Sequence, residues 1–293
     1  MFLSTVQRVP AILSVTEFTD PGCPFAFSAE PSRWRTRWLY ADHELDWRPR
    51  MVVLARTAEE YAAKGITPEI AAGGAEQLSE AYGMPMFSGV RDRVPGTLPA
   101  CTAVVATRLH APEHEAGMLR RLRLRQFNGE NLDEASTITH AAQDVGLDPE
   151  TVTGWMDELD VKAAVEADAT AARHPAPAAL VLDHKLADWE SGRRYTCPSW
   201  ELVPGDNDAA TQVVPGFQPF AVYDVVLANL LPGVERRADA TSVTEVLAWA
   251  GEPMAAAEVA AVCAIERDEA IDQLADSGAT RIPWGNGALW ELG

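Results

Sequence analysis

The segment from Ala11 to Phe18 is apolar except at Ser14, Thr16 and Glu17, and it predicts a β-strand. Pro10 precedes the segment and the turn-forming Asp20-Pro21-Gly22 follows it, so residues that terminate strands stand at both ends. Every second residue from Ala11 to Glu17 lies on one face of this strand. The last position of that otherwise apolar face is an acid, which marks Glu17 as a candidate functional residue.

The next segment predicts a helix from Pro24 to about Leu39, because proline is well tolerated at the first position of a helix. Pro31 lies inside this segment and predicts a kink or a break there. A second strand is predicted over Glu44–Leu54.

A long helical block follows, between residue 57 and residue 175. Its apolar spacing predicts successive helices at Ala58–Lys64, Pro68–Tyr82, Ala100–His110, Glu113–Phe127, Asp133–Val145 and Asp160–Arg173. Asp148-Pro149 predicts a further helix start, with a capping aspartate before a first-turn proline. Strands return at Pro198–Val203 and Thr211–Val214, and Pro219–Leu231 predicts a helix. Such a block between strands indicates an inserted helical subdomain.

Residues 241–293 form a separate pattern. Three short helices are predicted, followed by a hairpin over Thr280–Leu292 with its turn at Gly285-Asn286-Gly287; the helices are Ser242–Ala250, Ala255–Ala264 and Arg267–Gly278. Three helices and a two-stranded wing resemble a winged helix, a fold that often binds DNA. Residues 236–293 hold only four arginines against ten acidic residues, however, so we expect no binding to a polyanion.

The whole chain has a net charge of -19, which also argues against nucleic acid and anionic membrane surfaces as partners. No apolar run approaches the roughly 18 residues of a membrane-spanning helix, and the first residues lack the features of a secretory signal. Four cysteines among 293 residues do not make a disulfide framework, so we expect a cytoplasmic protein. Cys101 and Cys263 lie in apolar helical patterns and are expected to be core residues.

The arrangement of residues around Cys23 predicts a reactive thiol. A strand, a short turn and then Cys23-Pro24 at a helix start place a thiol where unpaired backbone N–H groups stabilise a thiolate. Glu17 lies six residues earlier, at the end of the strand's inner face, where a buried carboxyl would exchange protons with the sulfur. His110 and His114 have a metal-like spacing, but Pro112 interrupts the helix between them, so no metal site is expected.

The stretch Asp20-Pro21-Gly22-Cys23-Pro24-Phe25 resembles the active-site motif of the DsbA family, especially its FrnE-like branch. The segment Gln126–Leu132, the helix after it and Gly146-Leu147-Asp148 are similar to the helical subdomain of that branch. The resemblance spans residues 11–231 and includes the order of strands and helices. It implies an α/β, thioredoxin-like domain over 8–56 and 176–235, an inserted helical subdomain over 57–175, and an additional winged-helix-like module over 241–293.

The chain departs from the family motif at Ala26, which occupies the position of the second cysteine. The resemblance implies that Pro198 is the cis-proline facing Cys23, and that the residue before it, Cys197, contacts the first thiol. Cys23 and Cys197 would then form a disulfide or jointly hold a substrate thiol. The substrate-contacting positions implied by the family are Pro24, Phe25, Ala26, Thr196 and Pro198.

The resemblance therefore implies a thiol-disulfide oxidoreductase with Cys23 as nucleophile and Glu17 as proton relay. Either Cys197 or a low-molecular-weight thiol, glutathione or mycothiol, would resolve the mixed disulfide, and no tightly bound cofactor is expected. The partner would be a small-molecule thiol or a protein disulfide. The sequence leaves open whether the protein forms a homodimer. Two alternatives are an enzyme like the kappa-class glutathione transferases and 2-hydroxychromene-2-carboxylate isomerases, and a catalytically degenerate binding or scaffold protein.

Overall fold

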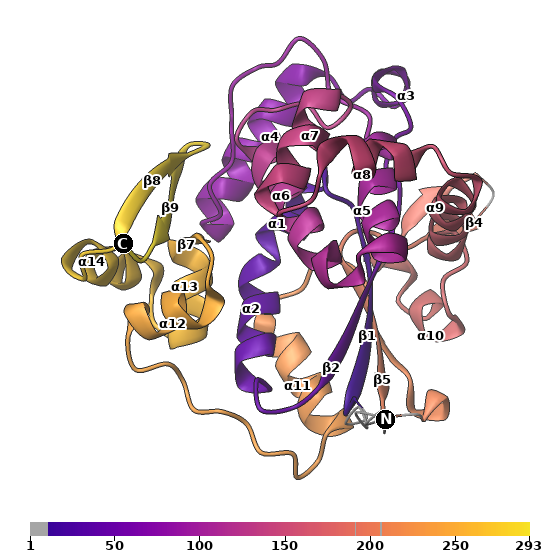
Figure 1. Ribbon diagram of the computed structural model, residues 1–293. Helices are drawn as coiled ribbons and strands as arrows, with labels where there is room; N and C mark the ends of the chain where they lie inside the picture. The colour runs from indigo at the N-terminus through magenta and orange to yellow at the C-terminus, as the bar shows by residue number, and fades with distance from the viewer. Residues whose placement is uncertain (1–10, 191, 206) are drawn as a thin grey trace, which may run out of the picture.

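A four-stranded mixed sheet forms the centre of the computed structural model, which describes residues 11–190, 192–205 and 207–293 (Figure 1). Its strands lie in the order β2 (Leu45–Met51), β1 (Leu13–Thr19), β5 (Ser199–Pro204) and β6 (Gln212–Val214). β1 runs parallel to β2 and antiparallel to β5. The mixed α/β, thioredoxin-like fold implied by the sequence is confirmed. The expected domain start at residue 8 lies outside the described residues.

The helix expected over Pro24–Leu39 is two helices, α1 (Pro24–Ser28) and α2 (Glu30–Leu39). The break falls at Ala29, and Pro31 is one of the first two residues of α2, where its missing N–H leaves no helical bond unmade. The predicted break is therefore present, two residues before the proline. Leu13 and Val15 on β1 share a buried apolar core with Trp34 and Trp38 of α2.

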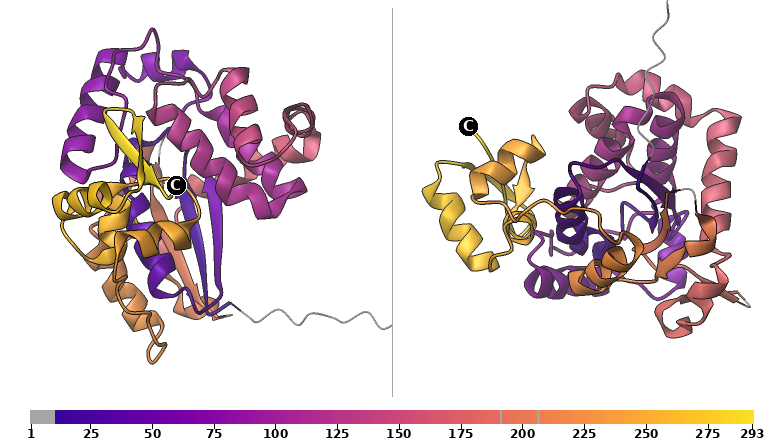
Figure 2. Two further views of the ribbon diagram at one scale, coloured as in Figure 1. Left: turned by 60° about the vertical axis from the view of Figure 1, so that its left-hand side comes forward. Right: turned by 90° about the horizontal axis from the view of Figure 1, so that it is seen from below.

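Most of the polypeptide between β2 and β5 is helical and covers one side of the molecule (Figures 1 and 2). The helices are α3 (Ala58–Ala63), α4 (Pro68–Tyr82), α5 (Leu98–His110), α6 (Glu115–Phe127), α7 (Ala135–Asp144), α8 (Pro149–Met156), α9 (Leu159–Ala172) and α10 (Pro177–Leu180). Asp148 caps α8 as predicted, accepting a hydrogen bond from the Thr151 backbone N–H at 2.9 Å. The sequence did not predict α10 or the two-stranded hairpin of β3 (Ala187–Trp189) and β4 (Gly192–Arg194).

The last part of the chain contains the three predicted helices and the predicted hairpin. They are α12 (Val243–Ala250), α13 (Ala256–Cys263), α14 (Arg267–Asp276), β8 (Thr280–Trp284) and β9 (Gly287–Glu291). A short strand that the sequence did not reveal, β7 (Met254–Ala255), pairs with β9 and makes a three-stranded sheet. We call residues 241–293 the C-terminal module.

The C-terminal module packs directly on α2, on the side of the molecule away from α9 (Figure 1). Trp249 makes edge-to-face contacts with Trp34 and Trp38, at centroid distances of 5.5 and 5.1 Å. The segment between α11 (Phe220–Leu230) and α12 is also held on α2, because the Trp38 indole N–H donates to the Ala238 carbonyl at 2.8 Å. The module therefore shares a hydrophobic core with the thioredoxin-like domain.

The tip of the β8–β9 hairpin reaches the helical insert. Asn286 Oδ1 accepts hydrogen bonds from Ser79 Oγ at 2.9 Å and from the Met86 N–H at 3.0 Å. A side chain at Gly285 would come within 2.9 Å of Met86 and Phe127 backbone atoms, so only glycine fits this approach. The module thus contacts both the thioredoxin-like domain and the insert.

Candidate functional site

Cys23 and Cys197 lie side by side, although 174 residues separate them. The sheet explains why they meet: Phe18 near the end of β1 is paired with Ser199 at the start of β5, and each cysteine lies just beyond this edge. The sulfur of Cys23 is 3.4 Å from the carbonyl oxygen of Cys197, to which the thiol donates. Both cysteines are free thiols, 5% and 6% exposed. The Cys197–Pro198 peptide bond is cis, as the resemblance implied.

The two thiols titrate in opposite directions. A hydrogen bond from Cys197 lowers the pKa of Cys23, and backbone N–H groups at Ala26 and Phe25 act in the same direction against the effect of burial. Burial raises the pKa of Cys197 well above its usual value, and the neighbouring Cys23 raises it further. Of the two thiols, Cys23 therefore loses its proton more readily, and Cys197 holds its proton more tightly.

An unpredicted acid, Asp20, stands next to this pair and is completely buried. Its carboxylate accepts hydrogen bonds from the Gly22 N–H at 2.8 Å, the Leu54 N–H at 2.9 Å and Thr97 Oγ1 at 2.8 Å. Burial raises the pKa of Asp20 despite these donors. When charged, Asp20 raises the pKa of both thiols. The turn before Cys23 was visible in the sequence, but nothing there distinguished its aspartate from an ordinary turn residue.

Glu17 is buried as expected, at 1% exposure, but its contacts are not those of a proton relay to Cys23. Its carboxylate is ion-paired with Arg33 and Arg123 and accepts a hydrogen bond from the Trp47 indole at 2.8 Å. Strand alternation explains the difference, because adjacent residues point to opposite faces and it is Phe18 that packs with Cys23 and Cys197. We therefore correct the assignment of Glu17 and place it in a buried ion-pair cluster.

The residues expected to touch substrate divide into exposed and buried ones. Phe25 is 44% exposed and begins an aromatic rim, with Phe217 at 5.9 Å between ring centroids and Tyr82 packed on Phe217 at 4.6 Å. Pro24 is partly exposed beside it. Ala26 is 1% exposed and is a core residue, so its expected contact with substrate is withdrawn.

The remaining substrate-contact expectations concern the segment around Cys197. Pro198 is buried. Thr196 is partly exposed, and its hydroxyl donates to the Lys185 carbonyl at 2.8 Å. The hydroxyl of Thr196 therefore fixes the segment before the cis-proline.

The other two cysteines differ in their surroundings. Cys263 belongs to the core beneath α2, as predicted. Cys101 is also fully buried, but its sulfur lies 3.5 Å from Asp20 Oδ2, so it borders the site. Burial raises the pKa of Cys101 well above its usual value, which keeps it a neutral thiol. Within the described residues, no group of three or more His, Cys, Asp or Glu side chains is placed to hold a metal ion.

Comparison with solved structures shows which known folds this architecture resembles. A candidate protein disulfide isomerase from Nitrosomonas europaea matches 74% of this chain and 96% of its own, with a TM-score of 0.55 and 15% identity. The cytosolic disulfide reductase DsbM from Pseudomonas aeruginosa matches 74% and 100%, with a TM-score of 0.51 and 16% identity. A candidate DsbA oxidoreductase from Streptomyces coelicolor, SCO1869, matches 78% and 94%, with a TM-score of 0.50 and 19% identity.

These neighbours define the class of fold: a thioredoxin-like sheet interrupted by a helical subdomain. More narrowly, it is the fold of DsbA-like proteins, which the sequence implied. No protein-family model matches the sequence, and no curated protein matches it either. Among the described residues, no helix is both long and apolar enough to span a membrane.

Proposed function

We propose that the protein is a thiol-disulfide oxidoreductase in which Cys23 is the nucleophile and Cys197 replaces the missing neighbouring cysteine as the resolving thiol. The observation that supports this most strongly is the contact of Cys23 with Cys197 beside the cis-proline. The lowered pKa of Cys23 also favours it, because the thiolate is the attacking form of a thiol. The DsbA-like fold agrees with this chemistry.

The proposed reaction has two exchange steps. The Cys23 thiolate attacks one sulfur of a substrate disulfide, forms a mixed disulfide and releases the first substrate thiol. Cys197 then attacks the Cys23 sulfur, its proton passes to the departing sulfur, and the second substrate thiol leaves. The substrate gains two electrons from the two protein sulfurs and one proton from Cys197, and the solvent protonates the thiolate released in the first step. The protein is left with a Cys23–Cys197 disulfide. The reverse sequence would oxidise a substrate dithiol.

A low-molecular-weight thiol is the alternative resolving group. Ala26 removes the usual neighbouring thiol, so an external thiol would attack the mixed disulfide if Cys197 did not. We propose a cytoplasmic location, with a small-molecule or protein disulfide as partner and without nucleic acid. We also propose that the protein forms a homodimer.

Disulfide mapping tests the proposal directly. The reduced protein is treated with a small disulfide and then digested under conditions that block exchange, and the peptides are identified by mass spectrometry. We expect a Cys23–Cys197 cross-link in the wild type and a stable mixed disulfide on Cys23 in Cys197→Ser. Cys263→Ser is the matched control, because Cys263 lies in the core beneath α2, and it should still form the cross-link.

Other outcomes would decide against the proposal. An unreactive Cys23 in the wild type would rule out the oxidoreductase and favour a binding or scaffold role. A mixed disulfide on Cys23 that persists in the wild type until external thiol is added would assign resolution to that thiol and exclude Cys197.

A further inference from the structure

Three aromatic rings from three separate segments form a continuous row beside Cys23. Phe25 belongs to α1, Tyr82 is the last residue of α4, and Phe217 lies shortly before α11. Phe217 contacts both of the other rings, at centroid distances of 5.9 Å to Phe25 and 4.6 Å to Tyr82. Phe25 is 44% exposed and Tyr82 is 41% exposed. We call Phe25, Tyr82 and Phe217 the aromatic rim.

The aromatic rim borders the segments of both thiols. The backbone N–H of Phe25 helps to stabilise the Cys23 thiolate. Phe217 follows Gly216, whose N–H donates at 2.9 Å to the hydroxyl of Ser199, the residue directly after the cis-proline. A substrate disulfide that reaches Cys23 therefore brings its neighbouring residues onto exposed aromatic rings.

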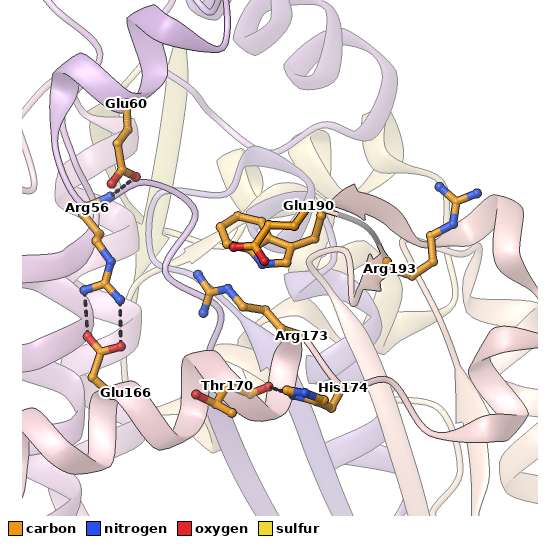
Figure 3. A pocket seen from close by; sticks show the side chains of 10 residues that line it. Arg56, Glu60, Glu166, Thr170, Arg173, His174, Glu190 and Arg193 are labelled. Atoms are coloured by element: carbon orange, nitrogen blue, oxygen red, sulfur yellow. Dashed lines mark hydrogen bonds and ion pairs between the residues drawn. The ribbon is translucent and has the colours of Figure 1, made fainter.

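A pocket of about 560 Å³ opens beside the β3–β4 hairpin and not at the thiols (Figure 3). Its lining combines three arginines with three glutamates, and Arg56 binds Glu166 through two hydrogen bonds at 2.7 Å. Of the described residues that line it, none is Cys23, Cys197 or a member of the aromatic rim. The surface that a substrate meets next to Cys23 is therefore the aromatic rim.

The C-terminal module fixes the part of α4 that carries Tyr82. The side chains that α4 buries are all small, alanine or serine, so they supply little packing of their own. Asn286, at the tip of the β8–β9 hairpin, accepts a hydrogen bond from Ser79 Oγ at 2.9 Å, one turn before Tyr82. The same Asn286 oxygen accepts from the Met86 N–H at 3.0 Å, shortly after the helix ends. One side chain of the module thus holds the chain on both sides of Tyr82.

The module also lies against Gly83, which ends α4. A Cβ at Gly83 would come within 2.7 Å of the Arg267 side chain and 3.1 Å of the Ala257 side chain. Ala257 and Leu289 of the module share a buried core with Ala75 of α4. The contacts of the module therefore fall on the half of α4 that ends in Tyr82.

We propose that Asn286 is a positioning residue that holds α4 so that Tyr82 completes the aromatic rim, and that the rim receives an aromatic side chain next to the disulfide of a polypeptide substrate. The inference rests on the proposed function and selects the protein disulfide from its two kinds of partner. Aromatic rings attract one another in edge-to-face and offset-stacked arrangements, and two rings of the rim have open surface for such a contact. A small polar disulfide has no ring to cover this surface.

Matched peptide disulfides test the inference. The oxidised dimer of acetyl-Phe-Cys-Phe-amide is compared with that of acetyl-Ala-Cys-Ala-amide, and the loss of free Cys23 thiol is followed by mass spectrometry against peptide concentration. The wild type should have the lower half-saturating concentration for the Phe peptide, and Tyr82→Ala should reduce this preference by about threefold to tenfold. Leu159→Ala is the matched control, because Leu159 is 83% exposed at the start of α9, and it should keep the preference.

Asn286→Ala should reduce the preference as Tyr82→Ala does, while the limiting rate and the pH curve of Cys23 alkylation stay unchanged. Asn286→Asp keeps the accepting oxygen and should restore the preference, which a general loss of folding would not allow. Asn229→Ala is the matched control, because it removes an exposed amide that donates to the Val225 carbonyl within α11, and it should behave as the wild type.

Equal half-saturating concentrations for the two peptides in the wild type, or an unchanged preference in Asn286→Ala, would overturn the inference. A changed pKa of Cys23 in Asn286→Ala would also overturn it, because Asn286 would then act on the thiol and not on the rim.

The S-methyl thioethers of the two peptides separate this inference from the proposed function, because they bind without thiol exchange. Tyr82-dependent binding of the Phe thioether, measured by saturation-transfer NMR, together with an unreactive Cys23 would refute the chemistry and leave the rim. Equal binding of the Phe and Ala thioethers would refute the role of the rim whether or not Cys23 reacts.

Discussion

Replacing Cys197 with alanine should raise the pKa of Cys23. The hydrogen bond from Cys197 is the largest influence on the Cys23 thiol, and it favours the thiolate. Cys197→Ala removes this donor and leaves the backbone N–H groups of Ala26 and Phe25 to act against burial alone. At neutral pH a smaller fraction of Cys23 would then be ionised.

The size of the effect follows from the energy of one hydrogen bond to a charged group. Such a bond contributes about 1.5–3 kcal/mol. Since about 1.36 kcal/mol is a factor of ten in an equilibrium constant, the thiolate fraction of Cys23 at a pH below its pKa is expected to fall by about tenfold or more. Alanine also leaves a small gap beside Cys23, which reduces the desolvation of its sulfur, so the lower end of this range is expected.

The pKa is measured from the rate of iodoacetamide alkylation of Cys23 against pH, followed by mass spectrometry of the Cys23 peptide. Cys197→Ser retains a donor in the same position and should raise the pKa less than Cys197→Ala does. Cys263→Ala lacks a thiol in the core beneath α2 and should leave the curve unchanged. An unaltered or lower Cys23 pKa in Cys197→Ala would show that the contact between the two cysteines does not activate the nucleophile.

The remaining predictions concern the buried charges and the close approach of the hairpin. Asp20→Asn should lower the pKa of Cys23 in the alkylation assay, because the charge of Asp20 raises it; an unchanged value would contradict this. Burial raises the pKa of Glu30, but three arginines outweigh it and hold the pKa at about 2, below the ordinary 4.5. Glu30 therefore stabilises the fold fully above about pH 4.5, and this stability is lost as the pH falls towards 2. Urea titrations should show Glu30→Gln to be about 3 kcal/mol less stable at pH 7 and to lack this acid dependence. Gly285→Ala should be destabilised by at least about 1 kcal/mol more than Gly251→Ala. Both glycines have positive φ, but a methyl group at Gly251 would meet no atom, whereas one at Gly285 would meet backbone atoms. Equal stabilities of the two variants would refute the role of the contact.

Elements with strong local signals were predicted closely. The helix expected over Pro68–Tyr82 has these bounds in the structure, because a proline starts it and Gly83 ends it in a left-handed conformation. The short strands β3, β4 and β7 were not predicted. Two or three residues are too few to show a period, and each of these strands exists only because a partner strand lies beside it.

The two cysteines of the site were identifiable because each stands next to a proline in a recognisable sequence. The roles of the acidic residues around them were not identifiable from the sequence. Asp20 has no local feature that predicts its burial, and Glu17 has the expected position with different partners.

Local sequence was sufficient for the longer strands and helices and for the thiol at the start of a helix, and the family resemblance implied the cis-proline opposite that thiol. These features depend on backbone preferences that act over a few residues, or on a motif retained in the chain. The partners of each buried charge and the packing of the C-terminal module on α2 required the folded chain. Their energies come from contacts between residues that are often a hundred or more positions apart, and only the packing of the elements against one another selects which of those residues meet.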